Sequence, residues 1–166
     1  MAEEEKRVDT MLQLPRWEEL PDFGLYMDQV IVLMERALAG VLPKGELTKS
    51  MVNNYVKVGL IPRPAGKKYD REHLAMLLMS CILKQALSMD EIAALLGMLC
   101  SCGTWACYDQ FLEEVDGLRK AVVSGRIDLW LERADEQRQA LRAGVVAAIC
   151  TIFAREMISG AKVKNI

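Results

Sequence analysis

The chain has 166 residues, 52% of them hydrophobic, which is enough to bury a sizeable core in one large or two small domains. Its net charge of −2 argues against a nonspecific coat for nucleic acid. Because the first residues are charged and no apolar run reaches membrane-spanning length, we expect a cytoplasmic protein that does not contact a membrane.

Positive charge is concentrated in one stretch of the sequence. Residues 1–43 hold four Lys/Arg against nine Asp/Glu, residues 44–71 hold seven against two, and the remainder holds ten against twelve. Uneven charge is also common on an ordinary solvated surface. Since the positive stretch coincides with a predicted helix and turn, we interpret it as a surface for nucleic acid.

The N-terminal third is predicted to support that stretch. Residues 1–13 are polar and charged, and we expect them to be flexible. Residues 15–23 indicate an extended arm whose Trp17 and Phe23 pack on the core, with stacking on a nucleic-acid base as the alternative. From Gly24 to about Ala39, apolar residues recur at intervals of three and four, which predicts an amphipathic helix.

A short basic helix follows a flexible joint at residues 40–46. Thr48 is a helix-capping residue type and Gly59 tolerates the backbone conformation that ends a helix, so we predict a helix over residues 49–58. Its apolar side includes Tyr55. Its polar side consists of Lys49, Asn53, Asn54 and Lys57. Amides can pair with adenine edges and lysines with guanine or phosphates, which favours reading of DNA rather than catalysis.

The next segment contains Pro62, Pro64 and Gly66, which forbid a helix and permit a tight turn. We predict a short β-hairpin, or wing, here. It would project three cations beside the basic helix, namely Arg63, Lys67 and Lys68.

Two further helices complete the first unit. Asp70 is placed to cap a helix over residues 71–86, whose apolar residues recur at helical spacing. Ser88 and Glu91 have the spacing of a capping box that opens the next helix.

Several of these segments carry a resemblance to a known family. The run from Val52 to Leu60, the pair Lys68-Tyr69 followed by Leu74, and the run from Ala86 to Ile92 resemble the winged helix-turn-helix of mercury-resistance-regulator (MerR-like) transcription factors. Residues 14–96 also resemble a bacterial family of unknown function that is similar to those regulators.

The resemblance implies a mostly α-helical, MerR-like winged helix-turn-helix with a short β-hairpin wing, which binds double-stranded DNA. Asn53 and Asn54 stand where those regulators usually have arginine and tyrosine. The implied DNA-binding residues are Lys49, Asn53, Asn54, Tyr55, Lys57, Arg63, Lys67, Lys68 and Tyr69.

Three of the five cysteines lie between residues 97 and 107, beyond the predicted DNA-binding unit. Thiolates at Cys100, Cys102 and Cys107 could bind a soft metal, but the spacing is not that of a known metal motif. Buried structural cysteines are the alternative that we favour. In a cytoplasmic chain we expect no disulfide.

Two C-terminal helices are predicted, over residues 106–123 and from about Asp128 to Ile158. The second half of the latter is apolar on nearly every side and must be covered. We predict that it packs against a second copy in a homodimer, with burial inside the monomer as the alternative.

These predictions divide the chain into a flexible N-terminus (1–13), a winged helix-turn-helix domain (14–96) and a helical dimerisation region (97–166). No catalytic motif is found in the sequence, and we expect neither an enzyme nor a cofactor. The predicted function is a dimeric transcriptional regulator that reads paired half-sites. A protein-interaction module that keeps the fold without reading DNA is the alternative.

Overall fold

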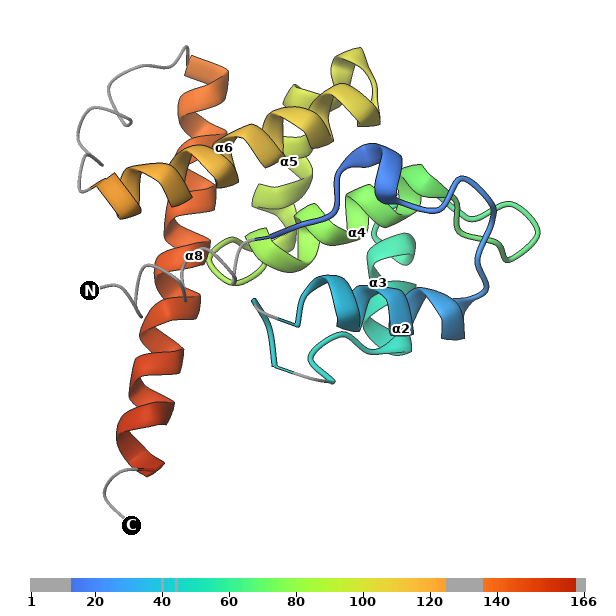
Figure 1. Cartoon of the computed structure of the whole chain (residues 1–166). Coiled ribbons are helices and arrows are strands. Elements are labelled where there is room, and N and C mark those ends of the chain that lie inside the picture. Colours follow the sequence, from blue (N-terminus) through green and yellow to red (C-terminus); the bar gives the residue numbers. More distant parts are fainter. Residues whose placement is uncertain (1–12, 40, 44, 125–135, 164–166) are drawn as a thin grey trace.

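The computed structural model describes residues 13–39, 41–43, 45–124 and 136–163, and it is built from helices (Figure 1). Two 3-10 turns, η1 (Trp17–Glu19) and η2 (Cys100–Cys102), accompany the longer helices. These are α2 (Met27–Ala37), α3 (Lys49–Lys57), α4 (Arg71–Leu83), α5 (Met89–Leu99), α6 (Thr104–Ser124) and α8 (Glu136–Val163).

Helix α4 lies at the centre of the molecule. Ten of its residues, from His73 to Leu83 with the exception of Met76, are buried. Helices α2, α6 and α8 contact it from different sides, and Figure 1 shows α6 and α2 on opposite sides of it. A helix that is apolar on every side is stable in water only when neighbours cover it all round. The other helices therefore form a shell around α4.

Local capping signals place three of the helix starts. The Thr48 hydroxyl accepts a hydrogen bond from the Met51 amide at 3.2 Å. The Asp70 carboxylate caps α4, and Ser88 with Glu91 forms a reciprocal capping box at the start of α5. Each cap satisfies amides that have no partner inside the helix. The three predicted helix starts are confirmed.

The predicted β-hairpin wing is wrong. Residues 62–70, which we name the basic loop, contain no strand, and within the described ranges the chain forms only isolated β-bridges, Ala65 with Lys68 and Leu25 with Tyr69. Pro62 and Pro64 lack the amide hydrogens that a ladder needs. Beyond Lys68 the chain pairs with the N-terminal arm instead of with itself.

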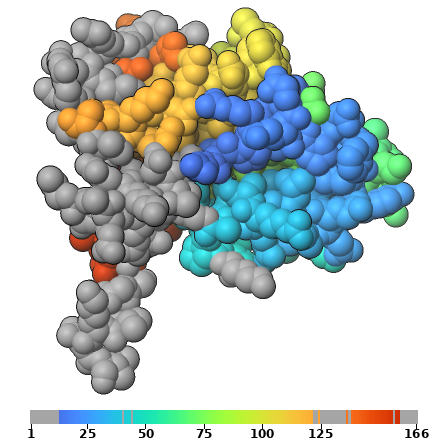
Figure 2. All heavy atoms as spheres, viewed as in Figure 1, coloured from blue at the N-terminus to red at the C-terminus, as the bar shows by residue number. Residues whose placement is uncertain are grey.

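The N-terminal arm, residues 13–26, is fastened to the core at several points. Leu25 and Tyr69 exchange two backbone hydrogen bonds of 2.8 Å. The Arg71 Nε atom donates to the Leu20 carbonyl at 2.9 Å, and the Tyr108 hydroxyl donates to the Pro15 carbonyl at 2.7 Å. Figure 2 shows this arm in dark blue between α6 in orange and α2 in light blue.

The prediction for the arm's aromatic residues is half right. The Trp17 ring packs in a tilted geometry against Tyr108, with ring centroids 6.3 Å apart. Phe23 does not pack into the core, because 63% of its surface is exposed.

Helix α8 is covered by its own chain over its first half. Leu141, Val145, Ala148 and Ile152 are buried, and the helix contacts α4, α5 and α6. Gly144 permits close approach, because a Cβ atom there would lie 3.3 Å from the side chains of Leu83 and Leu87. The C-terminal end of α8 projects past the body of the molecule (Figure 1). Burial inside the monomer, the alternative to a homodimer, therefore covers the predicted apolar segment as far as Ile152, whereas Met157 and Ile158 stay exposed.

A largely buried charge cluster joins α6 to α8. The Glu114 carboxylate is 1% exposed and accepts hydrogen bonds from Arg142 at 2.7 and 3.3 Å and from Arg138 at 3.1 Å. Arg138 also donates to the exposed carboxylate of Glu113 at 2.5 Å. Buried charges are tolerated when they are paired and hydrogen-bonded.

None of the described helices is by itself long and apolar enough to cross a membrane. Helix α5, continued by η2, and helix α6 together have the length and apolar composition of a membrane span, but the two segments are bent by 114° relative to each other.

We predict that Glu114→Gln lowers the free energy of unfolding by about 3–5 kcal/mol, because it replaces the buried carboxylate that pairs with the Arg142 guanidinium by a neutral amide. The matched control is Glu113→Gln on the same turn of α6. That carboxylate is largely exposed, so its loss should cost only about 0–1 kcal/mol. Urea unfolding of the two variants measures both values, and equal destabilisation would contradict the structural role of Glu114.

Candidate nucleic-acid interface

Helix α3 has one buried and one exposed side. Val52 and Tyr55 are buried, which fixes the rotation of the helix about its axis. Asn53, Asn54 and Lys57 are exposed as a consequence of the 3.6-residue period. The helix ends before Gly59, whose φ of +78° is a conformation that side chains with a Cβ atom rarely adopt.

Two of the predicted DNA-binding residues lie in the core. Tyr55 and Tyr69 are only 3% and 4% exposed. Burial, with smaller contributions from Cys81 and Glu46, raises the pKa of Tyr55 to about 12, and burial also raises the pKa of Tyr69. In this fold neither side chain can reach a nucleic acid. This corrects the predicted set of contacts.

Two of the predicted cations have partners inside the chain. Lys49 at the start of α3 forms an ion pair with Asp28 on α2. The ammonium group of Lys68 lies 5.5 Å from the centre of the Tyr26 ring, a cation–π geometry. Both contacts are on the surface and join the positive stretch to the N-terminal third.

The other predicted residues are exposed polar side chains with no hydrogen bond, ion pair or ring contact among the residues that the structure describes. We name these five residues the open polar set; they are Asn53, Asn54, Lys57, Arg63 and Lys67. Two amides and three cations are therefore available to an external partner.

The basic loop holds its cations at the tip of a tight turn. Gly66 and Lys67 have φ values of +56° and +64°, and the Lys68 amide donates to the Ala65 carbonyl at 3.0 Å. Two successive positive φ angles are characteristic of a type I′ turn. The turn directs the chain back toward Leu25, and this fixes the base of the loop on the arm.

Sequence reasoning missed the contacts of Asp28 and Tyr26 with the positive stretch. Both residues precede α3 by about twenty positions or more, and no local pattern links them to Lys49 or Lys68. The predicted amphipathic helix over residues 24–39 contains the acidic residues Asp28 and Glu35. Which lysine they would meet depends on the path of the connection from α2 to α3.

The cysteine segment does not form a ligand set. Cys100 and Cys107 are joined as a disulfide across the corner between α5 and α6, and Cys102 is an exposed free thiol. The expectation of no disulfide is therefore wrong. In the described part of the chain, no group of three His, Cys, Asp or Glu side chains is placed to hold a metal ion.

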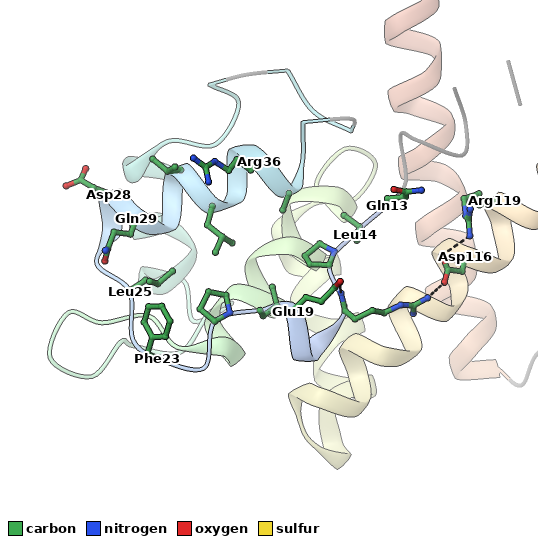
Figure 3. A pocket seen from close by; sticks show the side chains of 17 residues that line it. Gln13, Leu14, Glu19, Phe23, Leu25, Asp28, Gln29, Arg36, Asp116 and Arg119 are labelled. Carbon is green, nitrogen blue, oxygen red and sulfur yellow. Dashed lines mark hydrogen bonds and ion pairs between the residues drawn. The ribbon is translucent and has the colours of Figure 1, made fainter. Parts of the chain in front are cut away.

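A groove of about 1180 Å³ lies between the N-terminal arm, α2 and α6 (Figure 3). Asp116 and Arg119 lie at one end of the groove, and Phe23 and Asp28 lie at the other. Its wall includes Val32, which is 50% exposed. Sequence reasoning did not anticipate this groove, because its walls come from segments about 100 residues apart.

Comparison with known proteins supplies a family and no activity. The model of a family described as a domain of unknown function, DUF1836, matches residues 15–111, which is more than half of the chain. No curated protein and no solved structure matches the chain. The matched segment runs from the N-terminal arm through α2, α3, the basic loop, α4 and α5 into the first turns of α6. The chain therefore belongs to the DUF1836 family, a domain of unknown function.

Proposed function

We propose that the chain binds double-stranded DNA through the exposed side of α3 and the basic loop, and that it acts as a transcriptional regulator. The observation that carries this proposal is the open polar set, in which two amides and three cations lie within fifteen residues of sequence and have no partner in the described chain. Carboxylates are scarce there: residues 44–71 contain only Glu46 and Asp70.

The open polar set contains side chains suited to contacts with DNA bases and side chains suited to contacts with DNA phosphates. Asn53 and Asn54 can each pair with an adenine edge, while Lys57, Arg63 and Lys67 suit phosphates. Helix α3 has 9 residues and is therefore about 14 Å long at about 1.5 Å per residue. An α-helix fits the major groove because its diameter with side chains, about 10–12 Å, matches the groove width of about 12 Å.

Lys49 and Lys68 could also bind phosphates if they left their partners within the chain. An exposed ion pair such as Lys49 with Asp28 contributes little to stability, so exchanging the carboxylate for a phosphate costs little. The cation–π contact of Lys68 is likewise at the surface.

We also propose that two copies associate through the exposed end of α8, so that paired half-sites can be read. Met157 and Ile158 are 74% and 59% exposed there, whereas the first half of the helix is covered by its own chain. Two-fold symmetry of the protein would match an approximately palindromic operator.

The groove of Figure 3 supports a second candidate function, a protein-interaction module. Exposed apolar side chains around a hollow, such as Phe23 and Val32, are a common feature of protein-binding surfaces. Titration of the full chain with duplex DNA distinguishes the candidates. No binding even at low salt would leave the interaction module as the better account.

We expect the double variant Lys57→Gln/Lys67→Gln to bind all duplex sequences more weakly. The slope of log affinity against log salt concentration should become shallower by about 1.8, since each neutralised phosphate contributes about 0.9. Fluorescence anisotropy with a labelled duplex at several salt concentrations measures the slope. Lys120→Gln on α6 is the control and should match the parent. An unchanged slope in the double variant would remove both lysines from the interface.

The side-chain amides should affect which DNA sequences are preferred, rather than the affinity for all sequences. Asn53→Ala should relax the preference for adenine at one position of the selected sites, at a cost of about 1–3 kcal/mol for the preferred base and little for others. Selection of bound duplexes from random DNA, followed by sequencing, compares the variant with the parent. If the two selected motifs were identical, Asn53 would have no role in reading bases.

Negative charges introduced at the exposed end of α8 test whether two copies associate there. Met157→Asp/Ile158→Asp should convert a dimer into a monomer, because two carboxylates would be desolvated at the interface. Sedimentation equilibrium measures the mass of the parent and the variant. Ala143→Asp, at an exposed position on the covered half of α8, is the control and should leave the mass unchanged. A parent that sediments as a monomer would contradict the proposal.

A further inference from the structure

A second, smaller cavity lies on the inner side of α3. It has a volume of about 250 Å³, is partly open to solvent, and is lined by the connection from α2 to α3, by α3 itself, by the end of α4 and by Arg155 on α8. A cavity of this size holds several water molecules or one small metabolite. It is separate from the surface proposed for DNA, because Met51 and Tyr55 face it while Asn53 and Lys57 are exposed to solvent.

One part of the cavity wall is apolar. Leu42 and Leu47 are buried, and the flexible side chain of Met51 is half-buried beside them. Such a wall favours a short aliphatic group over a hydrated ion.

The rest of the wall carries charges of both signs. The Glu46 carboxylate and the Lys84 ammonium group are exposed, and within the described residues neither forms an ion pair. Arg155 donates a hydrogen bond to the side-chain oxygen Oε1 of Gln85, and the side-chain Nε2 of Gln85 donates to the backbone carbonyl of Cys81 at 3.3 Å. The side chain of Gln85, the neighbour of Lys84 in sequence, thus holds the Arg155 guanidinium at the cavity as a second cation.

The buried groups beside the cavity are neutral. Burial and the charge of Glu46 raise the pKa of the Cys81 thiol to about 12, so the thiol stays protonated and is a poor nucleophile at neutral pH. The Tyr55 hydroxyl is covered, and it has no hydrogen-bond partner within the part of the chain that the structure describes. A buried hydroxyl without a partner is unusual and requires an explanation such as a missing ligand or water. These properties indicate binding rather than covalent chemistry.

We propose that this cavity binds a free amino acid with a short aliphatic side chain. Its ammonium group would pair with Glu46, its carboxylate with Lys84 and Arg155, and its side chain would contact Leu42, Leu47 and Met51. A zwitterion is favoured because it offers each charged group of the wall an opposite charge. A fatty acid would lack the contact with Glu46, and an amine would lack the contacts with Lys84 and Arg155, so each forms fewer favourable interactions than a zwitterion.

The experiment titrates the isotope-labelled full chain with three probes, followed by amide resonances. L-leucine carries both charges, 4-methylpentanoate only the carboxylate, and 3-methylbutylamine only the ammonium group. We expect L-leucine to shift the resonances of Tyr55, Cys81 and Lys84 saturably, with each single-charge probe at least about tenfold weaker. Absence of saturable shifts with L-leucine up to about 10 mM would overturn the proposal. A dissociation constant of about 10 mM corresponds to a binding free energy of about −2.7 kcal/mol.

Variants test the assigned charges. Glu46→Gln and Lys84→Gln each change one exposed side chain and should weaken L-leucine at least about tenfold without unfolding the chain. Lys120→Gln on α6 is the control and should bind as the parent does. If Glu46→Gln and Lys84→Gln both bound L-leucine with parental affinity, the cavity would not be the site. All titrations are done without DNA, so they do not depend on the proposed function.

Discussion

The all-round burial of α4 is the constraint on which the other elements depend. Its residues from Leu77 to Leu83 are all buried, so neighbours must cover every side of it. Helices α2, α6 and α8 supply that cover. Helices α2 and α6 also line the groove, whereas the small cavity is lined by the connection from α2 to α3, by α3, by the end of α4 and by Arg155 of α8. One cluster of buried residues runs from Leu20 to Ile152 and includes side chains of all these helices.

Features governed by short-range chemistry could be predicted from the sequence. Thr48, Asp70 and Ser88 each bond to an amide three residues away, so a cap is visible in the sequence itself. Helical periodicity also placed Tyr55 on the buried side of α3, whereas family resemblance placed it at the DNA, and periodicity was right. A resemblance transfers a role to a position, but the rotation of a helix is decided by what its apolar side chains must cover.

Features governed by long-range contacts could not be predicted. The basic loop ends in a turn whose chain pairs with Leu25, more than forty residues earlier, and so the wing did not form as a separate hairpin. Likewise, Asp28 and Tyr26 take up two of the predicted DNA-binding cations. In each case the sequence identified a residue type correctly but held no information about which distant group would reach it. The structure therefore adds the internal partners of Lys49 and Lys68, and DNA binding by this surface stays a prediction.

Helix α3 lies between the two sites that we propose. Because the helix is short, a ligand in the cavity is close to the surface proposed for DNA and could affect DNA affinity through α3. One side carries the amides and Lys57, while Met51 and Tyr55 on the other side line the cavity. An occupant of the cavity would contact α3 and α8 together, and so it would restrict movement of α3 relative to the core. Such a restriction changes DNA affinity only if α3 has two positions that differ in affinity for both ligands. The eleven-residue connection between α2 and α3, which contains the positive-φ Gly45, is the segment that would have to absorb that movement.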